Sequence, residues 1–357
     1  MSKNYYPSAF DLHEVCKYYL KRYELNNIIQ GEGIFMMNST PEDIALKLSH
    51  LLFDKDKLDI IQGQAYKASE NYTMSGFSIN SKGEYSLNEA YETLRTDDSI
   101  TLSDGYKLSI LTKETIGDKA CFVGSLDYRK KKPGRIEFMD TEQGLSEFKM
   151  FDLGNGKWQI EVNGTKPNDG REVKRLFETI IKKEKDVSMS FLEVDKMKPS
   201  QTISFFDKLM LIGLGSDWSY QDVKQLTFRR GQDNGNENDN DDEEATDTDL
   251  MGIKQAILEG KNLRDADFVK KFEKQGCMFT AMTFEFLHIR EPKKIHMHAE
   301  FKGNPKIFEV SIANYYEATG IDAKYEMVGL PKDDCLKLQS VFWNNAKDTY
   351  YKVLIED

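Results

Sequence analysis

Histidines and charged residues alternate with apolar residues in a short segment near the C-terminal end, IHMHAEFK at 295–302. Successive side chains of an extended strand point to opposite faces, so His296, His298, Glu300 and Lys302 are expected to share one face. The apolar residues between them then share the other face. The segment is therefore predicted to be a strand with one buried side and one charged side.

The pairing of this strand with its neighbours decides which acids join the histidines. A tight turn at 303–304 is expected to pair Ala299 with Phe308, which places His298 opposite Glu309. On the other side of the strand, a turn at 291–292 is expected to bring Glu285 beside His298. We call the resulting polar surface the His/Glu face, made of Glu285, His296, His298, Glu300, Lys302 and Glu309.

Two chemical hypotheses arise for the His/Glu face. Imidazole and carboxylate groups at this spacing can bind Zn²⁺ or Mn²⁺, or act as an acid and base pair. Glu300-Phe301-Lys302 also has the E-x-K spacing that restriction-type nucleases place on a strand, where the carboxylate binds Mg²⁺ and the lysine activates water. This alternative, a metal-dependent nuclease or hydrolase with a divalent metal as cofactor, takes Glu285, Glu300 and Lys302 as catalytic residues and His296, His298 and Glu309 as metal ligands.

The structural interpretation of the same face is a solvated sheet surface. Antiparallel sheets commonly have one polar face, and alternation alone then explains the charges. We favour this interpretation, with no metal and no other cofactor.

One dense cationic cluster lies between two predicted strands. It is a candidate site for a polyanion or an acidic partner, because lysines and arginines at a hairpin tip can contact phosphates. The alternative is a solvated turn whose lysines deter pairing of strand edges. We call it the basic tip, and its residues are Arg129, Lys130, Lys131, Lys132 and Arg135.

Motifs of common enzyme classes are missing from the sequence. It contains no GxxxxGK[ST], no GxSxG, no HExxH, and no GxGxxG after a predicted strand. The four cysteines are widely spaced with no CxxC pair, so neither a disulfide framework nor a structural zinc site is expected.

Periodicity and turn residues predict the elements that must position these groups. Apolar spacing predicts a helix over residues 12–23, and Thr40 with Pro41 marks the start of a second one. The run at 203–215 is ambiguous between helix and strand. Further helices are predicted at 170–184, 250–260, 265–275 and from Lys332 to about Leu354, and strands at 99–112, 119–128, 135–140, 146–153, 157–163, 278–289, 294–302 and 306–315. No internal repeat is visible.

The run DNGNENDNDDEEATDTD at 233–249 contributes nine units of negative charge to a formal net charge of −11. It has no large apolar residue, so burial cannot offset the entropy of ordering it. We therefore predict an α+β protein in two units joined by a disordered linker at 231–249. Residues 1–230 are expected to form a larger mixed unit of helices and antiparallel strands, and residues 250–357 a smaller unit whose three-stranded antiparallel meander is covered by helices.

Composition limits the classes of function that the protein can have, but it does not identify one. Hydrophobic residues at 39% suffice for real cores, and no stretch has the roughly 20 apolar residues of a membrane span. We expect a cytoplasmic protein, with a bias to Lys, Asn, Asp and Tyr that suits a bacterium or phage. The favoured function is a non-catalytic binding or adaptor subunit of a bacterial complex, in nucleic-acid processing or antiviral defence. A protein partner is favoured, nucleic acid could bind only through the basic tip, and no membrane contact is expected.

Overall fold

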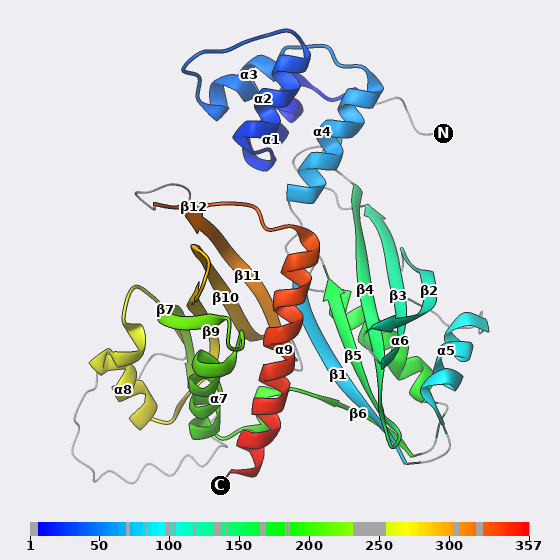
Figure 1. The fold of residues 1–357 in the computed structure, drawn as a ribbon. Helices are drawn as coiled ribbons and strands as arrows, with labels where there is room; N and C mark the ends of the chain where they lie inside the picture. Colours follow the sequence, from blue (N-terminus) through cyan, green and yellow to red (C-terminus); the bar gives the residue numbers. More distant parts are fainter. Residues whose placement is uncertain are drawn as a thin grey trace, which may run out of the picture.

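The chain folds as an α+β protein, which confirms the predicted fold class (Figure 1). A helical unit at the N-terminal end stands beside a twelve-stranded sheet in which every described strand pair is antiparallel. This computed structural model describes residues 6–68, 72–82, 85–96, 102, 105–116, 119–131, 137–139, 141–164, 169–182, 184, 186–230, 255–302, 307–318 and 324–356.

The helical unit consists of α1 (Ala9–Tyr19), α2 (Arg22–Gly31), α3 (Pro41–Ser49) and α4 (Lys55–Ala68) around a core of its own. The helix predicted over residues 12–23 is in fact two helices, α1 and the start of α2. The predicted start of α3 is confirmed, because the Thr40 side chain accepts a hydrogen bond from the Asp43 amide and the Asp43 side chain caps the Thr40 amide in return.

The remainder of the chain repeats one order of elements, which the sequence did not reveal. Each half has a strand, a helix, a four-stranded meander and a final helix. The first half contains β1 (Thr73–Ser81), α5 (Leu87–Thr96), β2 (Tyr106–Ile116), β3 (Lys119–Lys131), β4 (Thr141–Gly154), β5 (Lys157–Gly164) and α6 (Asp169–Ile181). The second contains β6 (Val187–Phe191), α7 (Pro199–Ile212), β7 (Trp218–Arg230), β9 (Cys277–His288), β10 (Lys293–Lys302), β11 (Ile307–Ala318) and α9 (Lys332–Ile355).

Extra elements interrupt only the second half. β8 (Gln255–Glu259) and α8 (Asp267–Lys274) come between β7 and β9, and β12 (Tyr325–Met327) precedes α9. In both halves the last meander strand returns to the first strand. β5 pairs with β1 along its length, and β11 meets the chain just after β6 through a bridge between Glu193 and Ile307.

The final helices of the two halves pack on opposite faces of the sheet, with α9 in front and α6 behind in Figure 1. Neighbouring residues of β1 show this, because Met74 belongs to the core beneath α9 while Phe77 packs against Phe177 of α6. β1 therefore lies at the join of two cores, one on each side of the sheet.

The acidic run does not separate two independent units as the sequence predicted. β7 precedes it and β9 follows it, yet the two strands pair from Trp218 and His288 to Arg230 and Cys277. One core contains Val223 from before the run and Phe284 from after it. Tertiary pairing therefore overrides the boundary suggested by composition, while residues 231–249 themselves lie outside the described residues.

Several other predictions can be compared with the structure. The three C-terminal strands, α9, α6 and α8 are confirmed, and the ambiguous run at 203–215 contains most of α7. The helix predicted at 250–260 is wrong, because its described part forms β8. The strand predicted at 135–140 is also wrong, because Glu137–Met139 form a short 3-10 helix, η1, that packs on the helical unit.

The close contact between α9 and β1 gives a first prediction. A Cβ atom at Gly76 would lie 2.5 Å from Trp343 and 2.6 Å from the Ile160 carbonyl oxygen, so Gly76→Ala is expected to lower the free energy of unfolding by about 1 to 3 kcal/mol. Gly63→Ala in α4 is the control, because no atom lies within 4 Å of its added Cβ. Chemical denaturation of both variants measures the difference. Equal stability of the Gly76 variant and wild type would contradict the packing of α9 on β1.

Candidate functional site

The strands of the His/Glu face pair two residues away from the predicted register. Ala299 pairs with Val310, so His298 lies opposite Ser311 and not opposite Glu309. The reason is the connection, since four residues separate β10 from β11 where a tight two-residue turn was expected. On the other side Glu285 pairs with His296, because four residues also connect β9 to β10.

The first charged group of this face is centred on Glu285. Its Oε2 atom lies 2.9 Å from Nε2 of His296, and its Oε1 atom lies 3.1 Å from the Lys224 ammonium. The Lys294 ammonium is 3.5 Å from the same carboxylate. Burial raises the pKa of Glu285, but the hydrogen bonds from His296 and Lys224 outweigh it and hold the pKa below its usual value. Asn314 lies 3.4 Å from the other ring nitrogen of His296, so both imidazole nitrogens have protein partners.

The second charged group is centred on Glu300. The Lys302 ammonium donates a hydrogen bond of 2.9 Å to Glu300, and Nε2 of His298 lies 3.9 Å from the carboxylate. The other ring nitrogen of His298 is 2.8 Å from the Thr283 hydroxyl. Burial opposes ionisation of Glu300, but His298 and Lys302 together lower its pKa to about 2. Glu300 is thus a fully ionised acid held by its neighbours.

These two groups do not converge on one point. Glu285 of β9 pairs with His296, whereas Glu300 pairs with Ala281, which lies four positions away from Glu285 on β9. Four positions correspond to about 13 Å. Among the described residues there is no cluster of three or more His, Cys, Asp or Glu side chains that could hold a metal ion. The nuclease hypothesis takes Glu285 as the second acid beside Glu300 and Lys302, and the observed register moves Glu285 away from that position, while Glu309 pairs directly with Glu300.

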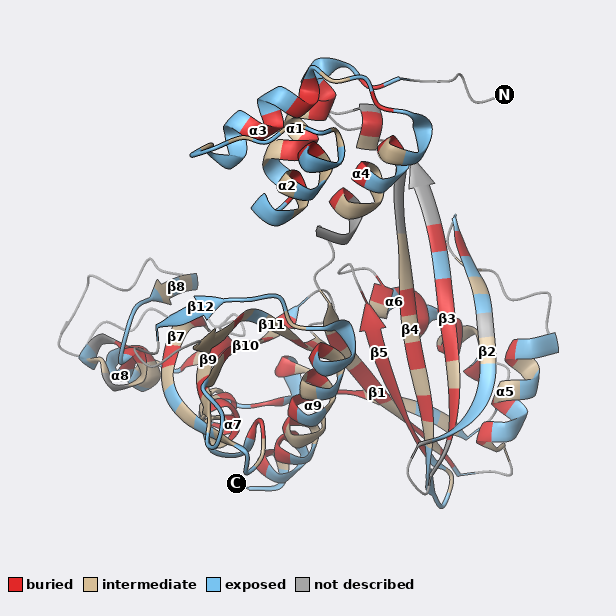
Figure 2. Ribbon diagram, turned by 45° about the horizontal axis from the view of Figure 1, so that its top comes forward, coloured by how far each residue is buried: buried red, intermediate tan, exposed pale blue. Residues whose placement is uncertain are grey.

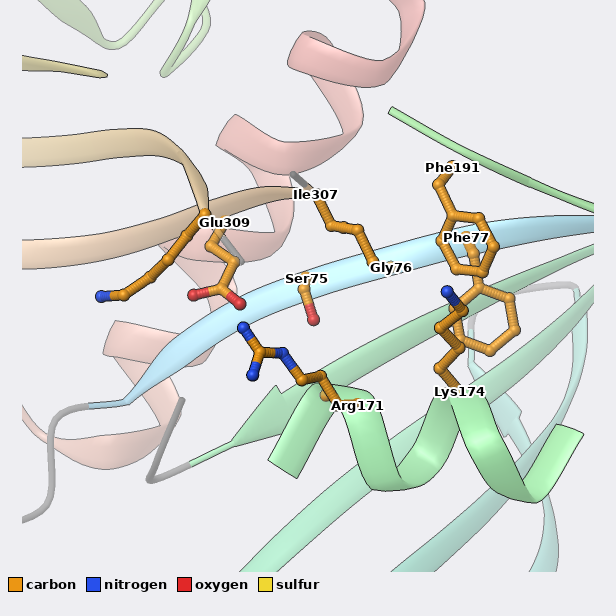
Figure 3. A pocket seen from close by; sticks show the side chains of 10 residues that line it. Ser75, Gly76, Phe77, Arg171, Lys174, Phe191, Ile307 and Glu309 are labelled. Carbon is orange, nitrogen blue, oxygen red and sulfur yellow. The ribbon is translucent and has the colours of Figure 1, made fainter. Parts of the chain in front are cut away.

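Two members of the predicted set instead line a small pocket where the halves of the sheet meet (Figure 3). Lys302 and Glu309 come from β10 and β11, and Ser75 comes from β1. Arg171 and Lys174 reach the pocket from the first two turns of α6. In Figure 3 the Arg171 and Glu309 side chains point toward one another across it. No sequence pattern pointed to Ser75, Arg171 or Lys174, because only the fold brings these segments together.

The surroundings of Glu309 shift its pKa in the opposite direction from that of Glu300. Burial raises its pKa to about 7, and the Glu300 carboxylate directly across the strand pair adds to the rise. Lys302 and Arg171 act in the other direction without cancelling it. Adjacent acids on one sheet face therefore have pKa values on either side of the ordinary glutamate value.

The predicted basic tip is only partly described. Arg129, Lys130 and Lys131 continue β3 and pair by backbone with residues 141–143 of β4. Lys132 and Arg135 lie outside the described residues.

A second candidate surface, not anticipated from the sequence, covers the helical unit. Figure 2 shows exposed residues along the outer sides of α1, α2 and α3. Nine large apolar side chains are exposed within this unit, against eleven in all the rest of the described chain. We call this set the apolar surface of the helical unit, and it comprises Tyr6, Phe10, Tyr18, Tyr23, Phe35, Met37, Leu46, Leu52 and Ile60.

The most exposed members of this set lie in the segment before α3 and in the segment directly after it. In the segment between α2 and α3, Ile34 and Met36 pack against the core of the helical unit. Phe35 and Met37 alternate with them and are 78% and 91% exposed, and Leu52 after α3 is 87% exposed. Coverage by a partner is one reason for such exposure, since contiguous apolar patches mark interaction sites.

Comparisons with known proteins add little. No protein-family model matches the chain, and no curated protein matches it. Among solved structures it is similar to the crystal structure of DynU16, a protein in the dynemicin biosynthetic locus, at 10% identity and a TM-score of 0.18. The match covers 80% of this chain and 98% of that chain, but similarity at this level supports no conclusion about function. No helix in the described part of the chain is both long enough and apolar enough to cross a membrane.

The arrangement of the His/Glu face leads to a prediction about metals. Zn²⁺ or Mn²⁺ at micromolar concentration is expected to leave the melting temperature unchanged, because the described residues contain no cluster of three metal ligands, and a metal at His296 would have to displace Glu285 or Asn314. His298→Ala is expected to cost no more than about 1 kcal/mol, the value of one half-buried hydrogen bond. A saturable rise in melting temperature that disappears in His298→Ala would contradict this and restore the enzyme hypothesis.

Proposed function

We propose that this chain is a non-catalytic binding protein that holds a protein partner through its N-terminal helical unit. The observation that carries the proposal is the apolar surface of that unit, above all Phe35, Met37 and Leu52. Aromatic residues and methionine are enriched in the buried centres of protein interfaces. Leaving such side chains in water costs free energy that a partner would recover.

The charge of the helical unit favours a protein over a nucleic acid as partner. Residues 1–68 contain eight Lys and Arg residues against nine Asp and Glu residues. Nucleic-acid surfaces require an excess of cations, which this unit lacks. Binding of a polyanion at the basic tip stays a prediction, as does a cytoplasmic bacterial complex of nucleic-acid processing or antiviral defence.

The two charged groups of the His/Glu face support a non-catalytic role. Glu285 and Glu300 each have cationic or imidazole partners within the sheet, so their carboxylates stabilise the fold. A catalytic acid or base needs access to a substrate atom at hydrogen-bond distance. Both carboxylates are engaged by these partners, and we propose a structural role for them.

Hydrogen exchange of a reconstituted complex tests the proposal. The partner is first identified by crosslinking of the intact chain in the cells that produce it, and the complex is then rebuilt from two purified proteins. Slower exchange in residues 32–40 and 46–52 of the complex is expected, because these segments carry the exposed side chains. Protection confined to the sheet, with none in the helical unit, would contradict the proposal.

A further inference from the structure

One short turn from the sheet enters the core of the helical unit. This turn is η1 (Glu137–Met139), which lies in the connection between β3 and β4. Its Phe138 is buried among the core residues of α1 to α4, and Met139 packs against the same core. Every other buried member of this core lies between residues 12 and 65. Among the described residues, Phe138 and Met139 are therefore what the sheet contributes to the core of the helical unit.

The chemistry of this contact resembles that of a bound peptide. Phe138 supplies one large aromatic side chain, and Met139 supplies a second apolar side chain next to it. The side-chain amide of Gln62 in α4 donates a hydrogen bond to the backbone carbonyl of Phe138. Short peptides are commonly held by side chains in pockets together with hydrogen bonds to their main chain. The helical unit thus holds η1 as it would hold a segment of another protein.

Phe138 lies at the edge of this core and not at its centre. It is 9% exposed, whereas Leu12, Val15 and Ile44 are at most 1% exposed. The four helices supply the centre of the core by themselves, so the Phe138 ring can leave without exposing it. We therefore expect the helical unit to stay folded when η1 is displaced.

The chain passes from the helical unit to the sheet once, between α4 and β1 (Figure 1). On the sheet side of this connection, the side-chain amide of Gln339 in α9 donates a hydrogen bond of 2.6 Å to the carbonyl of Tyr72. Tyr72 therefore stays fixed to the sheet when the contact at Phe138 opens. The helical unit then remains attached through the chain while its contact with η1 is exchanged for another.

We propose that the helical unit has a binding site for a short turn in which methionine follows an aromatic residue, and that the chain fills this site with its own Phe138 and Met139. A partner segment of the same chemistry binds by displacing η1, so the internal contact is autoinhibitory. The inference rests on the proposed function, because it names the chemistry of one segment of the partner. The site is distinct from the exposed side chains of Phe35 and Met37.

Competition within the chain determines the affinity expected for such a segment. A group attached to the same molecule acts at an effective concentration in the millimolar range. A free peptide therefore binds the wild-type chain poorly, because Phe138 already fills the site. Removing the Phe138 side chain opens the site and is expected to strengthen binding of the peptide at least about tenfold.

A peptide with the sequence of residues 134–142, GRIEFMDTE, tests the inference. The peptide carries a fluorescent label, and its anisotropy is followed while the intact chain is added. The Phe138→Ala chain is expected to bind it saturably, with a dissociation constant below about 1 mM. The same peptide with alanine in place of phenylalanine is expected to bind neither chain, because the aromatic anchor is missing.

Leu153→Ala is the matched control, because Leu153 is a half-exposed apolar residue near the other end of β4. This variant should bind the peptide as weakly as wild type. Circular dichroism is expected to show that Phe138→Ala keeps its helical content or regains it when the peptide is added. Absence of saturable binding to Phe138→Ala, equal binding to that variant and wild type, or a loss of helical content that the peptide does not restore would overturn the inference. Because no partner is used, such a failure leaves the exposed surface at Phe35 and Met37 untouched.

Discussion

Replacing Phe342 by alanine is expected to lower the free energy of unfolding by about 3 to 5 kcal/mol. Phe342 of α9 is fully buried, and its ring centre lies 5.6 Å from that of Phe284 and 6.2 Å from that of Phe286. Removing the ring leaves a cavity in the core that joins strands from both sides of the acidic run. Urea denaturation followed by circular dichroism measures the loss.

Val341→Ala is the control for this substitution. Val341 is the preceding residue of the same helix and is 44% exposed, so its truncation should change stability by no more than about 0.5 kcal/mol. A loss below about 1 kcal/mol for Phe342→Ala would show that α9 is not packed into the second half.

Replacing Glu309 by glutamine is expected to stabilise the protein at pH 8 by roughly 1 to 3 kcal/mol. The folded pKa of Glu309 is raised from 4.5 to about 7, so the folded state disfavours the ionised form. Between these two values the unfolded chain loses its proton first, and stability falls as pH rises. Glutamine cannot ionise, so it removes this penalty.

The same variant should show little gain at pH 4, where the carboxyl is largely protonated in both states. Glu300 has the reverse sign, because its lowered pKa stabilises the fold above pH 4.5 and this contribution disappears as pH falls toward 2. Glu326→Gln on the exposed strand β12 is the control and should be neutral at both pH values. Equal effects of Glu309→Gln at pH 4 and pH 8 would contradict the raised pKa.

Local patterns correctly predicted features of single helices and strands. Alternation in IHMHAEFK correctly placed the apolar side of β10 in the core and its charged side on the His/Glu face. Thr40 and Pro41 correctly marked the start of α3. These features depend on a few neighbouring residues, which is why sequence alone suffices for them.

Register and pairing over long distances could not be read in the same way. The contacts of His296 and His298 depended on loop length, and a shift of two residues keeps every side chain on its face while changing all its partners. The pocket joins Ser75 to Glu309 across more than two hundred positions. No local pattern encodes such a meeting, and the repeated order of elements was hidden because the two halves share topology without visible sequence similarity.

The acidic run shows how composition can mislead about domains. The residues of the run are too polar to join a core. This conclusion concerns the run alone and says nothing about the segments before and after it. The strands on either side, β7 and β9, nevertheless pair with one another. A solvated segment within a sheet and a linker between domains have the same composition.

The most direct test of the proposed function is the dissociation constant of the purified chain and its partner. Combined substitution of Phe35, Met37 and Leu52 by serine is expected to weaken binding at least about thirtyfold, equivalent to about 2 kcal/mol. Leu211→Ser is the control, because Leu211 is 78% exposed on α7 and lies outside the helical unit. An unchanged dissociation constant in the triple variant, with the control also unchanged, would contradict a partner surface on the helical unit.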